Sequence, residues 1–161
     1  MDLGAFSISL PVTDLARSRD FYATLGFTPT GGSEDDGYLI LANGTTIIGI
    51  FAFDGMDFDA PMLTFNPGLT QDMGTATEFT DVREVAAALD GSGVEPVARP
   101  EPGTGPAHLV VLDPDGHRIL VDQFVDAPGS GSSPVVRRRP RTRRRGRANP
   151  SPGLSPWRPP A

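Results

Sequence analysis

The stretch that decides the fold spans His108 to Gln123 and reads H-L-V-V-L-D-P-D-G-H-R-I-L-V-D-Q. Its two apolar runs, Val110 to Leu112 and Ile119 to Val121, flank the polar sequence D-P-D-G. Proline restricts φ and glycine admits the positive φ values that tight turns require, so the chain is expected to reverse here. We therefore predict a β-hairpin that closes the second half of an internal repeat.

The repeat is visible in the spacing of the residues that begin and end helices. In both halves an aspartate that can cap a helix lies 12 residues before a glycine that can end it: Asp14 and Gly26, then Asp81 and Gly93. The first half also has its own two-residue turn signal, Asn43-Gly44. We predict two β-α-β-β-β units, and hence an α+β fold.

The periodicity of apolar residues places the elements of each unit. In the first unit we predict strands at residues 6–12, 27–31, 38–42 and 45–51, and a helix from Asp14 to about Leu25. In the second we predict strands at 61–66, 94–98, 108–112 and 118–124, and a helix after Asp81. Residues 75–80 are an alternative position for the first strand of the second unit. We prefer 61–66 because its composition is more typical of a strand, and residues 67–78 are then an inserted loop. On the first helix, Leu15, Phe21, Tyr22 and Leu25 are expected to face the sheet.

Charge divides the 161 residues into two parts. Residues 1–126 hold all 20 acidic residues and five of the 14 arginines, a net charge of −15 with histidine neutral. Residues 127–161 hold nine arginines, no acidic residue and eight of the 17 prolines. Such a composition cannot bury enough apolar surface to offset the entropy of ordering. We predict a folded domain at 1–126 and a disordered basic tail at 127–161.

The tail admits three interpretations. It could bind nucleic acid through phosphate contacts, which predicts strong salt dependence and loss of affinity when 127–161 is deleted. It could dock on its own acidic domain. We favour a passive tail, the product of a GC-rich coding stretch, and therefore expect no nucleic-acid partner.

Several classes of function and location are not favoured by the sequence. It has no cysteine, which agrees with a cytoplasmic protein and leaves no disulfide or cysteine nucleophile. No signal peptide and no window long enough to span a membrane is seen. The G-x-S-x-G elbow, the phosphate-cradling glycine loop and the dinucleotide fingerprint are also missing.

Two motifs carry a resemblance to a known family. The run S-I-S-L-P-V-T-D-L-A-R-S-R-D-F-Y-A-T-L-G-F at 7–27 and the run D-P-D-G-H-R-I-L at 113–120 resemble the vicinal oxygen chelate superfamily, which includes glyoxalase I, bleomycin-resistance proteins and extradiol dioxygenases. The resemblance covers about 1–125. It implies an open cup of strands with the helices on the outer face, often buttressed by a second subunit, so we expect a homodimer.

Metal-dependent members of that superfamily hold an ion with four side chains on the inner face of the cup. The resemblance carries three of these positions onto Ser7, Gly49 and Leu120. The other falls on Met62 or Leu63 if 61–66 is the strand, and on Gly74 or Thr75 otherwise. Hard and borderline divalent ions require carboxylate or imidazole donors, so we expect neither a metal nor another cofactor. The only histidines, His108 and His117, are interpreted as a strand-face residue and a residue beside the turn.

A cup without a metal must bind its ligand by shape and a few polar groups. Counting by twos from the carried-over positions predicts the side chains on the inner face. They are Ser7, Ser9, Ile47, Phe51, Arg118, Leu120, Asp122 and Phe124. Arg118 could hold an anionic group of a ligand, or it could pair with Asp122 on the same strand, and these alternatives stay open.

Two functions follow from this inner face. The first is a metal-independent protein that binds or sequesters a small molecule. The second is a glyoxalase-like lyase or isomerase acting on a small carbonyl compound, with Asp122 or Glu78 as base and Arg118 stabilising enolate charge. Asp122 would serve as a base if desolvation raised its pKa.

Overall fold

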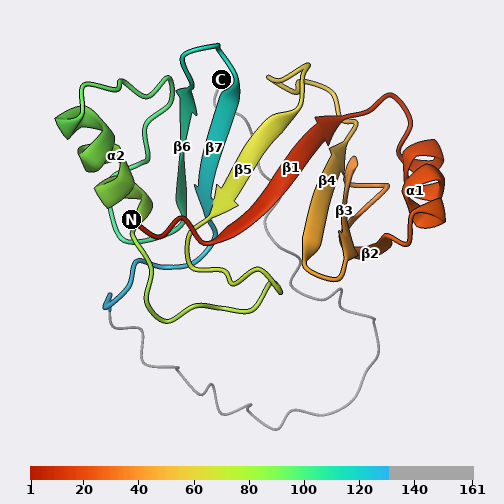
Figure 1. The fold of residues 1–161 in the computed structure, drawn as a ribbon, viewed down its shortest axis with the longest axis horizontal. Helices are drawn as coiled ribbons and strands as arrows, with labels where there is room; N and C mark the ends of the chain where they lie inside the picture. Colours follow the sequence, from red (N-terminus) through yellow and green to blue (C-terminus); the bar gives the residue numbers. More distant parts are fainter. Residues whose placement is uncertain (131–161) are drawn as a thin grey trace, which may run out of the picture.

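A computed structural model describes residues 1–130, coloured along the chain in Figure 1. The tail predicted to be disordered lies outside the described residues from residue 131 onward. The elements, in chain order, are β1 (Ala5–Pro11), α1 (Leu15–Thr24), β2 (Thr28–Ser33), β3 (Tyr38–Asn43), β4 (Thr46–Phe51), β5 (Met62–Asn66), α2 (Val82–Gly91), β6 (Ala107–Leu112) and β7 (Arg118–Gln123). Neither helix of the described part is long and apolar enough to cross a membrane.

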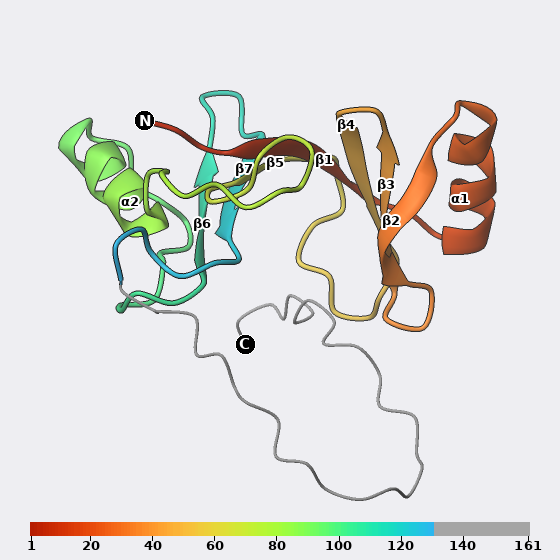
Figure 2. The ribbon, with the colours of Figure 1, turned by 90° about the horizontal axis from the view of Figure 1, so that it is seen from below.

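The strands form one open mixed sheet in the order β2-β3-β4-β1-β5-β7-β6. β1 pairs in parallel with β4 and antiparallel with β5, so the two units join at the middle of the sheet. Figures 1 and 2 show α1 beside the β2–β4 end and α2 beside the β6–β7 end. This arrangement confirms the predicted α+β class with a cup-like sheet.

Both helices begin at the predicted caps. The side chain of Asp14 accepts from the backbone N–H of Arg17 at 2.9 Å, and that of Asp81 accepts from Arg83 N–H at 2.8 Å. These bonds satisfy backbone donors that the first helical turn leaves free.

The predicted inward face of α1 was partly wrong. Leu15 is buried, but Phe21 and Leu25 are 59% and 55% exposed. Phe21 follows Leu15 by six residues, which places it about 120° around the helix from the buried stripe. Tyr22 follows Leu15 by seven, lies near the same stripe and packs against the core.

Two apolar clusters bury the outer face of the sheet under the helices. One contains Val82, Val85 and Ala86 of α2 with Leu109, Val111 and Val121 of the sheet. The other contains Leu15 of α1 with Leu39, Leu41 and Ile50. Because side chains alternate along a strand, the neighbours of these strand residues lie on the opposite face, which we call the inner face.

Both turn predictions are confirmed. Gly44 and Gly116 have φ of 58° and 88°, the conformation that their turns require of glycine. In the second turn the Asp113 carboxylate accepts from the backbone N–H groups of Asp115 and His117, at 2.9 and 2.8 Å. His117 Nδ1 lies 2.8 Å from Asp113 Oδ2, so this exposed histidine belongs to the turn.

The first strand of the second unit is β5, as preferred from its composition, and the segment after it is a loop. This loop is anchored under β1 by Gln71, whose side chain accepts from Phe6 N–H and donates to Phe6 C=O, both at 2.8 Å.

The strand predicted at residues 94–98 does not form. A single bridge joins Ala98 to Val110, and Val97 is 59% exposed. Pro96 has no N–H to donate to a ladder, and Pro100 and Pro102 follow closely. The second unit therefore has three regular strands where four were predicted.

Candidate functional site on the inner face of the sheet

The strand register brings the predicted inner-face residues onto one surface. Ser7 of β1 lies opposite Thr64 of β5, and Thr64 lies beside Leu120 of β7. Ser9 lies beside Gly49 of β4. By alternation along the same strands, Ile47, Phe51, Arg118 and Asp122 share this face. Phe124 does not belong to β7, which ends at Gln123, and is 38% exposed.

One part of the inner face is apolar and covered by the linker between the two units, residues 52–61. Phe58 of this linker is 6% exposed and packs with Met62, Val110 and Leu120. The ring of Phe51 contacts the ring of Phe58, with centroids 5.7 Å apart, and stacks on Tyr38 at 5.9 Å. Phe51 is therefore half-buried and packed against this cluster. Phe58 is a member of the inner face that alternation along strands could not predict.

Arg118 forms hydrogen bonds with the same linker. Its guanidinium donates to the backbone oxygen of Asp57 at 2.8 Å and to Asp57 Oδ2 at 3.1 Å. The open alternative of an Arg118–Asp122 pair is therefore wrong. The Nε atom of Arg118 is buried and has no hydrogen-bond partner, the only such side-chain atom among residues 1–130.

The other part of the inner face is polar and centres on Asp122. This residue is 9% exposed, and its carboxyl group makes no hydrogen bond or ion pair with any described residue. Desolvation raises the pKa of the carboxyl from its ordinary value of 3.8 to about 7. Its oxygens are not among the fully buried atoms without a partner, so they stay accessible from the inner face.

Side chains with hydrogen-bonding atoms lie on the inner face of the strands that flank Asp122. Asn66 Nδ2 donates to the backbone oxygen of Asp122 at 3.0 Å, and the hydroxyls of Ser9 and Thr64 are joined by a 2.9 Å hydrogen bond. His108 of β6 is paired directly with Asp122 and is half-buried. Directly paired residues project to the same face, so His108 borders the carboxyl. Only the pairing of strands shows that Thr64, Asn66 and His108 lie near Asp122, so the sequence could not have predicted it.

Glu78, the other predicted base, lies in the loop between β5 and α2. Its side chain is exposed and makes no hydrogen bond or ion pair in the described part of the chain. The structure does not bring it onto a strand of the inner face.

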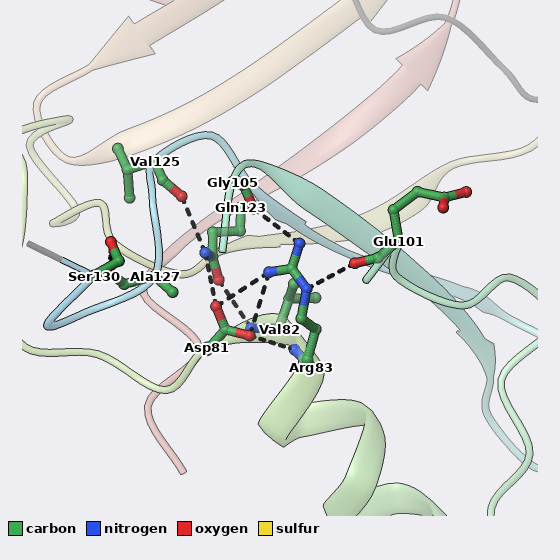
Figure 3. Close-up of polar contacts among 9 residues, drawn as sticks. All are labelled: Asp81, Val82, Arg83, Glu101, Gly105, Gln123, Val125, Ala127 and Ser130. Atoms are coloured by element: carbon green, nitrogen blue, oxygen red, sulfur yellow. Dashed lines mark hydrogen bonds and ion pairs between the residues drawn. The ribbon is translucent and has the colours of Figure 1, made fainter. Parts of the chain in front are cut away.

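The outer face holds a second buried aspartate with the opposite environment. Asp81 is 6% exposed and accepts from Gln123 Nε2 at 3.0 Å and from the guanidinium and backbone N–H of Arg83, as Figure 3 shows. Arg83 also donates to the backbone oxygens of Glu101 and Gly105, which ties α2 to the segment before β6. The carboxylate of Asp81 is therefore hydrogen-bonded and ion-paired, and its role is structural.

A comparison of the sequence with protein families gives a match that agrees with this fold. The sequence profile described as the Glyoxalase/Bleomycin resistance protein/Dioxygenase superfamily matches residues 4–121. The chain belongs to this superfamily. No curated protein matches the sequence.

Solved structures agree with the superfamily fold. A structure described as an NAD-dependent benzaldehyde dehydrogenase from Legionella pneumophila is 19% identical, with a TM-score of 0.56, and the match covers 74% of this chain and 98% of that one. A glyoxalase/bleomycin resistance protein/dioxygenase superfamily member from Vibrio splendidus 12B01 is 12% identical, with a TM-score of 0.53, covering 74% and 97%. The hypothetical protein BH1468 from Bacillus halodurans C-125 is 13% identical, with a TM-score of 0.52, covering 74% and 93%. At these identities the likeness shows the fold.

The residues at the positions that the resemblance assigned to metal ligands do not form a donor set for a divalent ion. Leu63 pairs with Ile119 and points to the outer face, which leaves Met62 as the inner-face residue of β5 near this position. Ser7, Gly49, Met62 and Leu120 then supply one hydroxyl and one thioether, without a carboxylate or an imidazole. Met62 and Leu120 are instead packed under Phe58. Residues 1–130 contain no cluster of three or more His, Asp or Glu side chains arranged to hold a metal.

Proposed function

We propose that this chain binds a small organic molecule on the inner face of its sheet without a metal ion, as a binding or sequestering protein. The supporting observation is the buried and unpartnered carboxyl group of Asp122. A buried polar group without a partner costs free energy, and a ligand that hydrogen-bonds to it removes part of that cost. The adjacent apolar side chains of Met62, Val110 and Leu120 are already covered by Phe58, so the carboxyl group is the part of the inner face that a ligand would contact.

Two further parts of the proposal come from superfamily membership. We propose that the chain acts as a homodimer, since members of this fold are often buttressed by a second subunit. We also propose that the superfamily's metal-dependent chemistry is not used, because the carried-over positions offer no set of donors for an ion. The cytoplasmic location and the passive role of the tail stay predictions.

The test of ligand binding is an NMR titration of the full-length ¹⁵N-labelled chain with a library of small fragments, in buffer that contains a chelator. Saturable shifts in the amide signals of Ser9, Thr64 and Leu120 are expected, and they should persist with the chelator present. Asp122→Asn should weaken binding, whereas Asp35→Asn, which removes one charge from the exposed β2–β3 turn, should not. Binding that needs an added divalent ion, or shifts confined to Val85 and Val111 on the outer face, would contradict the proposal.

A second candidate function is favoured by one observation. A carboxyl group whose pKa is about 7 can take up and release a proton near neutral pH, as a general base must. This supports a lyase or isomerase in which Asp122 removes a proton next to the carbonyl of a small substrate. Arg118 is less suited to the predicted role of holding the enolate, because its guanidinium is held by Asp57.

Proton exchange distinguishes the enzyme from the binding protein. If Asp122 is a base, the chain should speed the exchange of the α-protons of hydroxyacetone for deuterium, followed by proton NMR. Asp122→Asn should then slow this exchange by about 100-fold or more. No exchange above the buffer rate, together with binding on the inner face, identifies a binding protein.

A further inference from the structure

No arginine among the described residues pairs with Asp122. Four of the five arginines in residues 1–126 are engaged elsewhere: Arg19 with Asp20 and Glu34, Arg83 with Asp81, Arg99 with Asp90, and Arg118 with Asp57. The fifth, Arg17, is exposed on α1, which packs on β2, β3 and β4, whereas Asp122 lies on β7. His108, paired with Asp122 across the strands, is the one described group beside the carboxyl that can carry a positive charge, and it makes no ion pair with Asp122, so the carboxylate stays open to a cationic ligand.

The groups beside the carboxyl are rich in acceptors. Thr64 lies beside Leu120, one inner-face position from Asp122, and its hydroxyl shares one hydrogen bond with Ser9 and keeps a further lone pair. Asn66 uses its Nδ2 for the backbone of Asp122, and its Oδ1 makes no hydrogen bond in the described part of the chain. A ligand group with several N–H donors matches this set, and a carboxylate or phosphate does not.

We propose that the ligand of the inner face is an organic amine, and that its ammonium group donates hydrogen bonds to the Asp122 carboxylate. This inference rests on the proposed function and narrows it to one chemical class. The ammonium group supplies up to three donors and a positive charge, and ion pairing shortens and strengthens its hydrogen bonds to a carboxylate.

The inner-face residues next to Asp122 along the sheet are apolar and buried. Leu120 is two residues before Asp122 on the same strand and faces the same side. Leu120 belongs to the apolar cluster with Met62, Val110 and Phe58. Phe58 closes this cluster, with Val110 and Leu120 5% and 6% exposed, so the contact that selects the ligand is the one with the Asp122 carboxylate.

The charge of the whole domain favours the same class. Residues 1–126 carry a net charge of −15, which attracts cations and repels anions at low ionic strength. An anionic ligand would have to approach against this field and would leave the carboxylate uncompensated.

The proposed contact makes affinity depend on pH. On the strands that flank β7, the residues facing Asp122 are Thr64 and Asn66 on β5 and His108 and Val110 on β6. His108 is the only titratable group among these four, so its contribution must be separated by a variant. Asp122 ionises as pH rises, while an alkylammonium stays protonated, so affinity should increase with pH across neutrality.

The experiment compares three probes of similar shape and different charge, 2-phenylethylammonium, 2-phenylethanol and 3-phenylpropanoate, by NMR titration of the full-length chain. At about pH 8 the ammonium probe is expected to bind at least about tenfold more tightly than the alcohol, because it adds an ion pair in a desolvated site. The ¹³C signal of the Asp122 carboxyl should shift on binding. Affinity should fall at least about tenfold between about pH 8 and pH 5, as Asp122 takes up a proton.

Three variants complete the design. Asp122→Asn should abolish both the preference for the cation and the pH dependence, whereas the charge control Asp35→Asn should keep both. His108→Gln should keep the pH dependence if Asp122 is its source. Loss of pH dependence in His108→Gln with retention in Asp122→Asn would overturn the assignment.

The outcomes separate this inference from the proposed function. If the alcohol or the carboxylate binds the inner face as tightly as the amine, the amine class is overturned and the binding function stands. If none of the three probes shifts an inner-face signal while other fragments do, the amine class is again overturned. If no fragment of any charge binds there, both proposals fail.

Discussion

At the scale of single residues, the two buried aspartates show how the environment decides the role of one side chain. Asp81 lies on the outer face and receives hydrogen bonds from Gln123 and Arg83, while Asp122, next to Gln123 in sequence, lies on the inner face and receives none on its carboxyl. Because side chains alternate along β7, those of Asp122 and Gln123 project to opposite faces of the sheet. A carboxylate with partners stabilises the fold, whereas one without partners lowers stability whenever it is ionised.

The pH dependence of stability tests the state of Asp122. Its pKa is raised in the folded chain to about 7, so the folded state holds the proton more tightly than the unfolded state, and stability is lost as pH rises from about 4 through 7. The difference between a pKa of 3.8 and one of about 7 corresponds to roughly 4 kcal/mol. Asp122→Asn should therefore raise the free energy of unfolding at about pH 8 by up to this amount and change it little at about pH 4.

Urea unfolding at a series of pH values measures this effect. Asp90→Asn is a suitable comparison, because Asp90 is exposed and paired with Arg99, which lowers its pKa. A wild-type chain and an Asp122→Asn chain with parallel pH profiles would show that Asp122 is not desolvated.

At the scale of elements, the linker between the two units covers part of the inner face, which an open cup of strands would leave exposed. Residues 52–61 contain no helix or strand, yet Phe58 is buried on the inner face and Asp57 holds Arg118. Periodicity predicts the faces of strands and helices but says nothing about a residue in an irregular segment. The missing strand at 94–98 has a local cause, since Pro96 removes a donor from the ladder.

Replacing Phe58 tests whether the linker is part of the core. Phe58→Ala should lower the free energy of unfolding by about 3 kcal/mol, because it leaves Met62, Val110 and Leu120 without a packing partner. Asp57→Asn, which weakens a partly exposed ion pair, should cost about 1 kcal/mol or less. Chemical denaturation of the three chains measures both values. Equal stability of Phe58→Ala and wild type would mean that the linker does not pack on the sheet in solution.

At the scale of the whole molecule, the two units pair through β1 and β5 and carry their helices at the two ends of the sheet, as Figures 1 and 2 show. Between the helices, Phe6 and Leu63 are 39% and 38% exposed, and the ring of Phe6 lies 5.2 Å from that of Phe65. Of the two edges of the open sheet, β2 has one strand partner in the described residues, and the outer edge of β6 is paired only through the bridge between Ala98 and Val110.

The proposed homodimer is tested by sedimentation equilibrium. The full-length chain has a mass of 17.0 kDa, and at micromolar concentration or above we expect twice this value. Apolar surface and unpaired strand edges are the features that subunits bury when they associate. A mass of one chain at every concentration would contradict the dimer and would leave the inner-face proposals untouched.

Much of the fold was determined by the sequence alone, because the decisive signals are local. The caps Asp14 and Asp81, the turns at Gly44 and Gly116 and the alternation along β7 act within a few residues, and they placed both helices, the repeat and the side of the sheet on which Asp122 lies. Tertiary structure alone decided which groups meet. Strand pairing set His108 beside Asp122, the linker brought Asp57 to Arg118, and burial without a partner raised the pKa of Asp122. Contacts between residues distant in sequence depend on how whole elements pack, and local propensity carries no information about them.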